Sequence, residues 1–289
     1  MVIIQQILNG LTMGSVYALL GVGVTVVYKS LGLMNVAHGD MMMIGAFITL
    51  LIIDLGVPLW LAIILGIFCA GMLGLAMERF IYRKVNYGIM LNLMIATIGM
   101  QIVLRNAALV LWGVEPKAFP DMFSKGVIHM GPYVVAVRSV CIIILALCLV
   151  LLLQLFYKKT RIGKEMTVAA ANSTVASMLG INVNLTRFIT FGIGSSFAAL
   201  TGILIAPVYF VSQNMGAVVG VKALAAAVIG GFGNITGAFY GGIILGIVEA
   251  LGGGLISSAY KDIISFAVMI LVLYFKPYGL FAKHVDQKF

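Results

Sequence analysis

Polar side chains that interrupt an apolar run are the first candidates for chemistry in this sequence. Asn35, His38 and Asp40 lie in the otherwise apolar stretch LGLMNVAHGDMMMIGAF, residues 31–47. An ionisable group near hydrocarbon needs a polar partner and often marks the path of a solute. We expect these side chains either to cap and pack a broken helix end at the cytoplasmic mouth of the second span or to line a gate there. A metal site is disfavoured because His38 and Asp40 supply only two candidate ligands.

A second polar set follows a helical spacing. Thr97, Gln101 and Arg105 are four residues apart in the apolar run 90–111, so they share one helix face. Such a stripe is expected to face protein or water rather than lipid. Arg105 would lie about 10 Å from the outer end of its span. It is expected to snorkel or to find a polar partner, and attraction of an anionic substrate is a further hypothesis.

Glu249 and a glycine-rich segment before it are the remaining candidates. Glu249 lies in the middle of the apolar run 239–256. It should be neutral or partnered there, with a structural hydrogen bond or a transport role as the alternatives. Residues 220–237, GVKALAAAVIGGFGNITG, are too few for a complete span, which predicts a broken or re-entrant helix. Gly231 and Gly233 would allow close approach of backbone to a substrate or opposing subunit, or tight helix packing.

The elements that position these groups must be transmembrane helices. Of 289 residues, 62% are hydrophobic and 9% are charged. Soluble domains have roughly 45–50% and 25%. Because one spanning helix needs about 20 apolar residues, we predict an all-α bundle of about 8–9 spans, with broken or re-entrant helices, as a single domain over residues 1–289. The net charge is +9, and the charged residues lie mainly between the apolar spans. This distribution indicates loops at the membrane surface and not a nucleic-acid partner.

The polar stretch 157–187 is the exception in this apolar chain. It carries six charged residues around an Ala-rich centre that includes Ala169 and Ala170. Helix propensity predicts a helix from Gly163 to Met178, with Gly180 as its C-terminal stop. This helix would lie outside the hydrocarbon, in a loop of about residues 158–187. It could be a solvated loop or a helix that docks on a soluble partner.

The distribution of basic residues predicts the orientation. When alternate loops are assigned to opposite sides, twelve Lys and Arg fall on one side and five on the other. The twelve are Lys29, Arg79, Arg83, Lys84, Lys158, Lys159, Arg161, Lys164, Arg187, Lys276, Lys283 and Lys288. The five are Lys117, Lys125, Arg138, Lys222 and Lys261. The positive-inside rule makes the first side cytoplasmic. The N-terminus is then outside if residues 220–237 cross the membrane, which we prefer, and inside if they only dip into it.

Several long segments resemble one transporter family. They are RIGKEMTVAAANSTVASMLGINV (161–183), GLTMGSVYALLGVGVTVVYKSLGLMNVAHGDMMMIGAF (10–47), ERFIYRKV (78–85), GVKALAAAVIGGFGNITGAFYGGIILGIVEAL (220–251) and YKDIISFAVMILVL (260–273). In collinear order over nearly the whole chain, they are similar to the LivH-type permease subunits of branched-chain amino-acid importers driven by an ATP-binding cassette. Arg105 differs from the family pattern, in which an uncharged polar residue is expected at this position.

The resemblance implies a set of partners. They are a second homologous permease subunit, two cytoplasmic ATPase subunits and an extracytoplasmic substrate-binding protein, assembled in the bacterial plasma (inner) membrane. No catalytic residue, metal or cofactor is expected in this chain, and ATP and Mg²⁺ belong to the ATPase subunits. The sequence agrees, since it has no GxxxxGK[ST] loop: Lys164 is followed by Glu165.

The resemblance also assigns roles. Coupling to the ATPases is expected at Gly163, Lys164, Glu165, Ala169, Ala170, Asn172 and Gly180. The candidates for the translocation path or its gates come from the polar and glycine residues described above and not from the resemblance: Asn35, His38, Asp40, Gln101, Gly231, Gly233 and Glu249. The chain would move a small, branched-chain or apolar amino acid by alternating access. The alternative, an ion-coupled secondary transporter, needs buried acidic groups around its substrate, for which Asp40 and Glu249 are the plausible residues.

Overall fold

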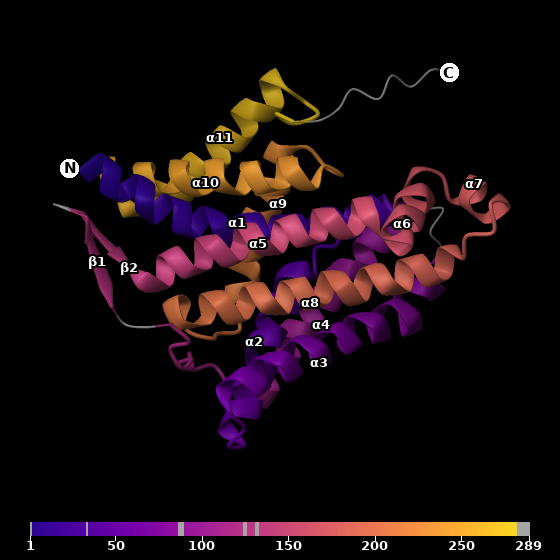
Figure 1. The fold of residues 1–289 in the computed structure, drawn as a ribbon, viewed down its shortest axis with the longest axis horizontal. Helices are drawn as coiled ribbons and strands as arrows, with labels where there is room; N and C mark the ends of the chain where they lie inside the picture. Colours follow the sequence, from indigo (N-terminus) through magenta and orange to yellow (C-terminus); the bar gives the residue numbers. More distant parts are fainter. Residues whose placement is uncertain (1, 33, 86–89, 124–125, 131–132, 282–289) are drawn as a thin grey trace.

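The computed structural model describes residues 2–32, 34–85, 90–123, 126–130 and 133–281 (Figure 1). The helices are α1 (Val2–Leu31), α2 (His38–Asp54), α3 (Leu59–Phe80), α4 (Met90–Trp112), α5 (Val137–Lys159), α6 (Arg161–Ala171), α7 (Ser173–Met178), α8 (Val183–Tyr209), α9 (Met215–Gly230), α10 (Ile235–Leu255) and α11 (Lys261–Phe275), with 3-10 turns at Tyr82–Lys84 and Ser258–Tyr260. Two short strands, β1 (Val127–Met130) and β2 (Tyr133–Ala136), form an antiparallel hairpin.

Seven helical segments of the described chain are long and apolar enough to cross a membrane. They are Val2–Lys29, Leu59–Lys84, Leu91–Trp112, Val137–Lys159, Val183–Tyr209, Ile235–Leu255 and Ser258–Phe275. Two shorter helices, α2 with 17 residues and α9 with 16, lie mostly buried among them. The predicted all-α transmembrane bundle is therefore confirmed, and the number of long and short helices is compatible with the expected 8–9 spans.

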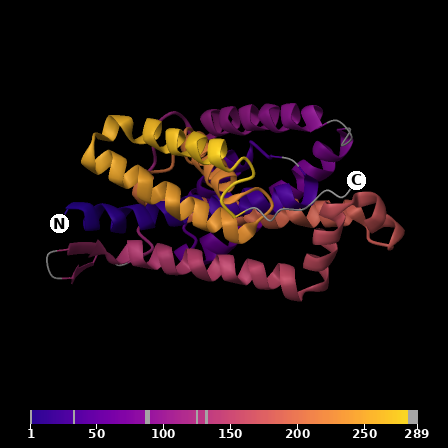
Figure 2. The ribbon, with the colours of Figure 1, turned by 90° about the horizontal axis from the view of Figure 1, so that it is seen from above.

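Helix α1 forms the centre of the bundle and packs along α10 through glycines on both helices. Gly10 and Gly14 lie against the backbone of Ile247 and Ile243, and Gly246 lies against the backbone of Gly14. Without side chains at these points the two backbones approach closely, which maximises dispersion contacts where no hydrophobic driving force acts between helices in lipid. Figure 1 and Figure 2 both show α1 and α10 side by side along their lengths.

This packing predicts a large effect of a side chain at Gly246. A Cβ atom there would overlap backbone atoms of Gly14, which cannot rotate away as a side chain can. We expect Gly246→Leu to destabilise the bundle by more than about 2 kcal/mol, the range of severe overpacking. The measurement is thermal unfolding of the purified protein in detergent. Gly99→Leu on α4 is the matched control, since a Cβ at Gly99 meets nothing within 4 Å. Equal melting temperatures for the two variants would contradict the argument.

The two ends of α5 show where the N-terminus lies relative to α6 and α7. The Gln5 side-chain amide donates to the backbone oxygen of Val134 in β2 at 2.8 Å, and β2 leads directly into α5. The other end of α5 leads into α6, so the start of α1 and the α6–α7 segment lie at opposite ends of the bundle (Figure 1). Helix α9 carries the chain from the N-terminal side, where α8 ends, towards the other side, where α10 begins. If α6 is cytoplasmic, the N-terminus is outside, as preferred from the sequence.

Helix α5 begins at Val137, because the β-branched residues before it pair in the β1–β2 hairpin. Two sequence predictions need correction. Arg187 belongs to α8, so the polar loop is shorter than predicted. Lys222 is not in an outer loop but inside α9, where it is buried. Lys125, Lys283 and Lys288, which also entered the charge count, lie outside the described residues.

Candidate functional site

The start of α2 lies deep in the bundle and not at its mouth. The His38 ring packs against Gly23 of α1, where a Cβ would collide with Nε2. Gly23 is eight residues before the end of α1 at Leu31, which corresponds to about 12 Å along the axis. The predicted position of His38 at the cytoplasmic mouth is therefore wrong. The depth is possible because Gly39 packs directly on the backbone of α9 at Gly216 and Gly220.

The residues before α2 form a buried turn. The Asn35 side-chain oxygen accepts a hydrogen bond from the backbone N–H of Ala37 at 3.1 Å. Asn35 therefore stabilises this turn and does not cap α2, whose N-cap residue is Ala37. The Nε2 atom of His38 is buried and has no hydrogen-bond partner in the described part of the chain. The turn and His38 thus place polar atoms inside the bundle beside α1.

Asp40, two residues further on, faces the polar stripe of α4. Its Oδ1 lies 3.5 Å from Nε of Arg105, and the Gln101 side chain lies beside the same carboxylate. Thr97, two turns before Arg105, is also buried. The stripe therefore faces protein as predicted, and Arg105 has the polar partner that its depth required. The sequence did not indicate that this partner is Asp40, because the depth of α2 was not evident.

A second ion cluster, buried at Lys222 and Glu249 and half-exposed at Asp262, joins four helices. Lys222 of α9 donates to Glu249 of α10 at 2.6 Å, and its Nζ lies 2.8 Å from Oδ1 of Asp262 on α11. Its Nζ also lies 5.6 Å from the ring centre of Tyr17 on α1. Glu249 is partnered, as its mid-helix position predicted. The partner was missed because Lys222 is 27 residues away and was assigned to a loop.

The glycines after α9 form a turn and not an open backbone surface. Gly231 and Gly233 have φ angles of 94° and 82°, which L side chains rarely adopt. This confirms the predicted break between two helices. The C-terminal segment covers the turn: Gly279 packs on Gly231, and the backbone N–H of Leu280 donates to Ile229 at 2.8 Å. Gly231 is thus occupied by packing within this chain.

The polar stretch contains two helices where one was predicted. Thr160 caps α6 through its side chain, which accepts from Gly163 N at 3.0 Å. Asn172 ends α6 and caps α7, since its side-chain oxygen accepts from the backbone of Thr174 and Val175. This local hydrogen bonding competes with continuation of the helix. The predicted stop at Gly180 is confirmed by its φ of 78°.

The α6–α7 segment extends from one end of the bundle (Figure 1, Figure 2). Gly163 packs on the end of α5 and Ala169 is buried, whereas Lys164 and Gly180 are exposed, and Ala170 is half-buried. Glu165 pairs with Arg161 at 2.9 Å. We define the α7 tip as three apolar side chains that remain exposed. They are Val175 (46%), Met178 (80%) and Leu179 (68%).

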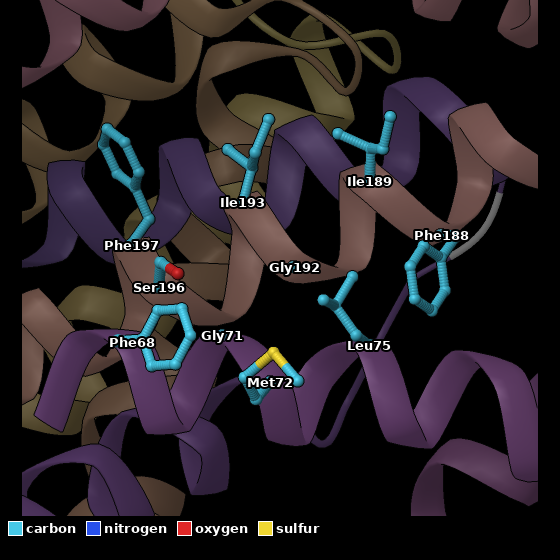
Figure 3. Close-up of a pocket in the computed structure, with 10 residues that line it drawn as sticks. All are labelled: Phe68, Gly71, Met72, Leu75, Phe188, Ile189, Gly192, Ile193, Ser196 and Phe197. Carbon is cyan, nitrogen blue, oxygen red and sulfur yellow. The ribbon is translucent and has the colours of Figure 1, made fainter. Parts of the chain in front are cut away.

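An apolar groove of about 420 Å³ lies between α3 and α8 (Figure 3). Phe68 and Met72 of α3 form one wall, and Ile193 and Phe197 of α8 form the other. Ser196 is the polar side chain in its lining, and its hydroxyl donates to the backbone of α3 at Ile67. Among the described residues, the lining includes no ionisable side chain. The groove is thus chemically unlike the charged clusters around Asp40 and Lys222.

Comparison with known proteins identifies the family. Residues 6–273 match the family described as the permease component of the branched-chain amino acid transport system. The chain is 35% identical to the high-affinity branched-chain amino acid transport system permease protein BraD of Pseudomonas aeruginosa, over 99% of this chain and 97% of the relative. It is 36% identical to the corresponding permease protein LivH of Escherichia coli, with the same coverage.

A solved structure supports the fold. PsaBC from Streptococcus pneumoniae in complex with Fab aligns with a TM-score of 0.52 and 12% identity, covering 93% of this chain and 90% of that one. At this identity the likeness concerns the fold alone. The family and the seven candidate spans make this a multi-pass protein of the plasma (inner) membrane. The chain belongs to the family of permease components of branched-chain amino acid transport systems, which are subunits of importers driven by an ATP-binding cassette.

Proposed function

We propose that this chain, as a permease subunit, moves a branched-chain or other apolar amino acid inward by alternating access. The observation that carries the substrate class is the identity of 35% and 36%, over nearly full length, to two permeases whose names state branched-chain amino acid transport. The matched part of the chain includes the segments around Asp40, α6–α7 and Glu249.

The α6–α7 segment is the proposed contact with the ATPases. Large exposed apolar side chains at a projecting tip favour burial against another protein, because exposed apolar patches on soluble surfaces are rarely left uncovered. Gly163 packs on the end of α5, Ala169 is buried, and α6 also contacts α8, so a push on the α7 tip would be transmitted to α5 and α8. Lys164, Glu165, Ala170, Asn172 and Gly180 are the coupling residues that remain available at the surface.

The remaining partners follow from this assignment. A second permease subunit would cover apolar faces such as those of α4 and α11, and a binding protein would deliver substrate at the side of the N-terminus. The two ATPase subunits would hold ATP and Mg²⁺. A secondary transporter is disfavoured because each of the two candidate acidic groups lies beside a cation of this chain, Asp40 beside Arg105 and Glu249 beside Lys222. The Lys222–Glu249–Asp262 cluster instead ties α9, α10 and α11 together.

The test is reconstitution in proteoliposomes. The chain is co-expressed with its neighbouring permease, ATPase and binding-protein subunits, purified as a complex, and assayed for uptake of labelled leucine. We expect uptake to require enclosed ATP on the cytoplasmic face and to persist without proton or sodium gradients. Uptake that follows an ion gradient without ATP, or purification of the chain with no ATPase, would reject the proposal.

A further inference from the structure

Three buried carboxylates in this chain differ in how closely their cations satisfy them. Glu78 receives two contacts of 3.3 Å from Arg83, and Glu249 accepts from Lys222 at 2.6 Å. Asp40 is completely buried, yet its nearest cation atom, on Arg105, lies 3.5 Å away. Within the described residues neither Asp40 oxygen accepts a hydrogen bond, and Nε and Nη2 of Arg105 donate none.

This incomplete pairing is the informative feature. A buried charge is stable only when hydrogen bonds replace those lost with water. Both oxygens of Glu78 accept such bonds, and one oxygen of Glu249 does, whereas neither oxygen of Asp40 does within the described residues. A pair that served stability alone would be expected to form hydrogen bonds between its two members, as Arg83 and Glu78 do. The Asp40–Arg105 pair instead leaves donor and acceptor capacity in the interior of the bundle. A third polar group would complete it.

Arg105 is the member of the pair that an incoming molecule can reach. A third of its side chain is exposed, 34%, whereas the Asp40 side chain is 0% exposed. Arg105 lies at the edge between the buried face of α4, with Leu104, and its exposed face, with Ile102. Away from the helix ends, the described spans hold one other cation, Lys222, and that residue is buried against Glu249 and Asp262.

The chemistry of the guanidinium selects the ligand. Its planar set of N–H donors matches a carboxylate, and the attraction is strengthened in a site of low dielectric constant. Asp40 restrains the guanidinium from the buried side, and Gln101 lies beside the same carboxylate as a further polar group. An anion bound at Arg105 would therefore meet a fixed donor within an otherwise apolar wall.

We propose that Arg105 binds the carboxylate of the transported solute, with Asp40 as the positioning residue that holds its side chain. For the function proposed above, on which this inference rests, the ligand group is the α-carboxylate of the amino acid. The apolar side chain of the substrate would then lie between the apolar face of α4 and the second permease subunit proposed to cover that face. Arg105 thus selects solutes that carry a carboxylate. Other contacts determine which sizes of substrate side chain are accepted.

Paired substitutions separate binding from simple charge neutralisation. Arg105→Gln alone leaves Asp40 buried without a cation, so its loss of activity would not discriminate. Asp40→Asn with Arg105→Gln removes both charges and relieves that penalty. We expect the double variant to assemble with normal melting temperature but to lose leucine uptake by at least about tenfold, the effect of one charge-assisted hydrogen bond. Arg138→Gln at the start of α5 is the control arginine.

A ligand comparison gives a readout that a structural role would not change. Isoamylamine is leucine without its carboxylate, and both compete for labelled leucine on the purified complex without binding protein. We expect the wild type to prefer leucine by at least about tenfold and the double variant to show no preference beyond about twofold. Asp40→Asn alone, which keeps Arg105, should retain part of the preference.

The outcomes distinguish the inference from the proposed function. If the double variant takes up leucine at the wild-type rate, or if the wild type binds leucine no better than isoamylamine, Arg105 does not bind the carboxylate. ATP-driven uptake by the wild type would still uphold the transport function in either case. If the wild-type complex shows no ATP-driven uptake, the proposed function fails and the inference falls with it.

Discussion

Aspartate at both Met178 and Leu179 is expected to abolish ATP-driven uptake. These exposed side chains of the α7 tip would be desolvated in the contact with an ATPase, and two carboxylates there would lose their water without gaining partners. A central interface side chain that is fully desolvated can contribute about 2 kcal/mol or more, and a buried carboxylate without a partner adds its own penalty. At about 1.4 kcal/mol per tenfold, the double substitution should weaken ATPase association by about a hundredfold or more.

Association is measured by co-purification of the ATPase subunits and by titration of purified ATPase onto the permease in nanodiscs. Leu55→Asp is the matched control, because Leu55 is an exposed leucine, 74%, at the end of α2 on the side of the bundle opposite α7. The control should bind ATPase normally. Normal binding and uptake in the Met178→Asp, Leu179→Asp variant would refute the coupling role of the α7 tip.

Lys222→Met is expected to be the most destabilising single change of charge. It removes the cation from Glu249, and breaking a buried ion pair typically costs about 3–5 kcal/mol. Lys261, at 3.9 Å from Glu249, is too distant and too exposed to replace it fully. The loss should appear as a much lower melting temperature of the complex in detergent.

Removal of the second charge should reverse most of that loss. In Lys222→Met with Glu249→Gln, no unpaired carboxylate remains in the apolar interior, and neutral replacements of buried pairs are often close to neutral in stability. We expect the double variant to melt near the wild type. A single variant as stable as the double would show that the cluster is solvated, and that the Lys222–Glu249 contact is not a buried pair.

Helix periodicity and charge located most spans, because burial in lipid requires long apolar segments with polar ends. Met90–Trp112 lies within one residue of its predicted end, and Gly180 ends a helix as its lack of a side chain suggested. The requirement of Glu249 for a partner was also predictable from depth. Its identity was not, since it depends on how α9 packs on α10, and no local pattern encodes the packing of two helices.

The depth of His38 shows a different limit. Local sequence predicts a capped helix start near the membrane surface, because polar residues precede an apolar run. The actual position depends on three glycines in two distant segments, Gly39 with Gly216 and Gly220, which let α2 and α9 pack backbone to backbone. The division of residues 161–178 was missed for a simpler reason: alanine propensity outweighed the capping preference of Asn172.

The glycine contact between α1 and α10 also constrains how the protein is made. Gly14 and Gly246 belong to the first and next-to-last of the long spans, so translation at about 5–20 residues per second separates them by tens of seconds. During that interval the small-residue face of α1 is in the bilayer without its native neighbour. Biogenesis must therefore keep an early helix from pairing with a wrong one until synthesis is nearly complete, and a helix-shielding insertion factor would serve this chain best at α1.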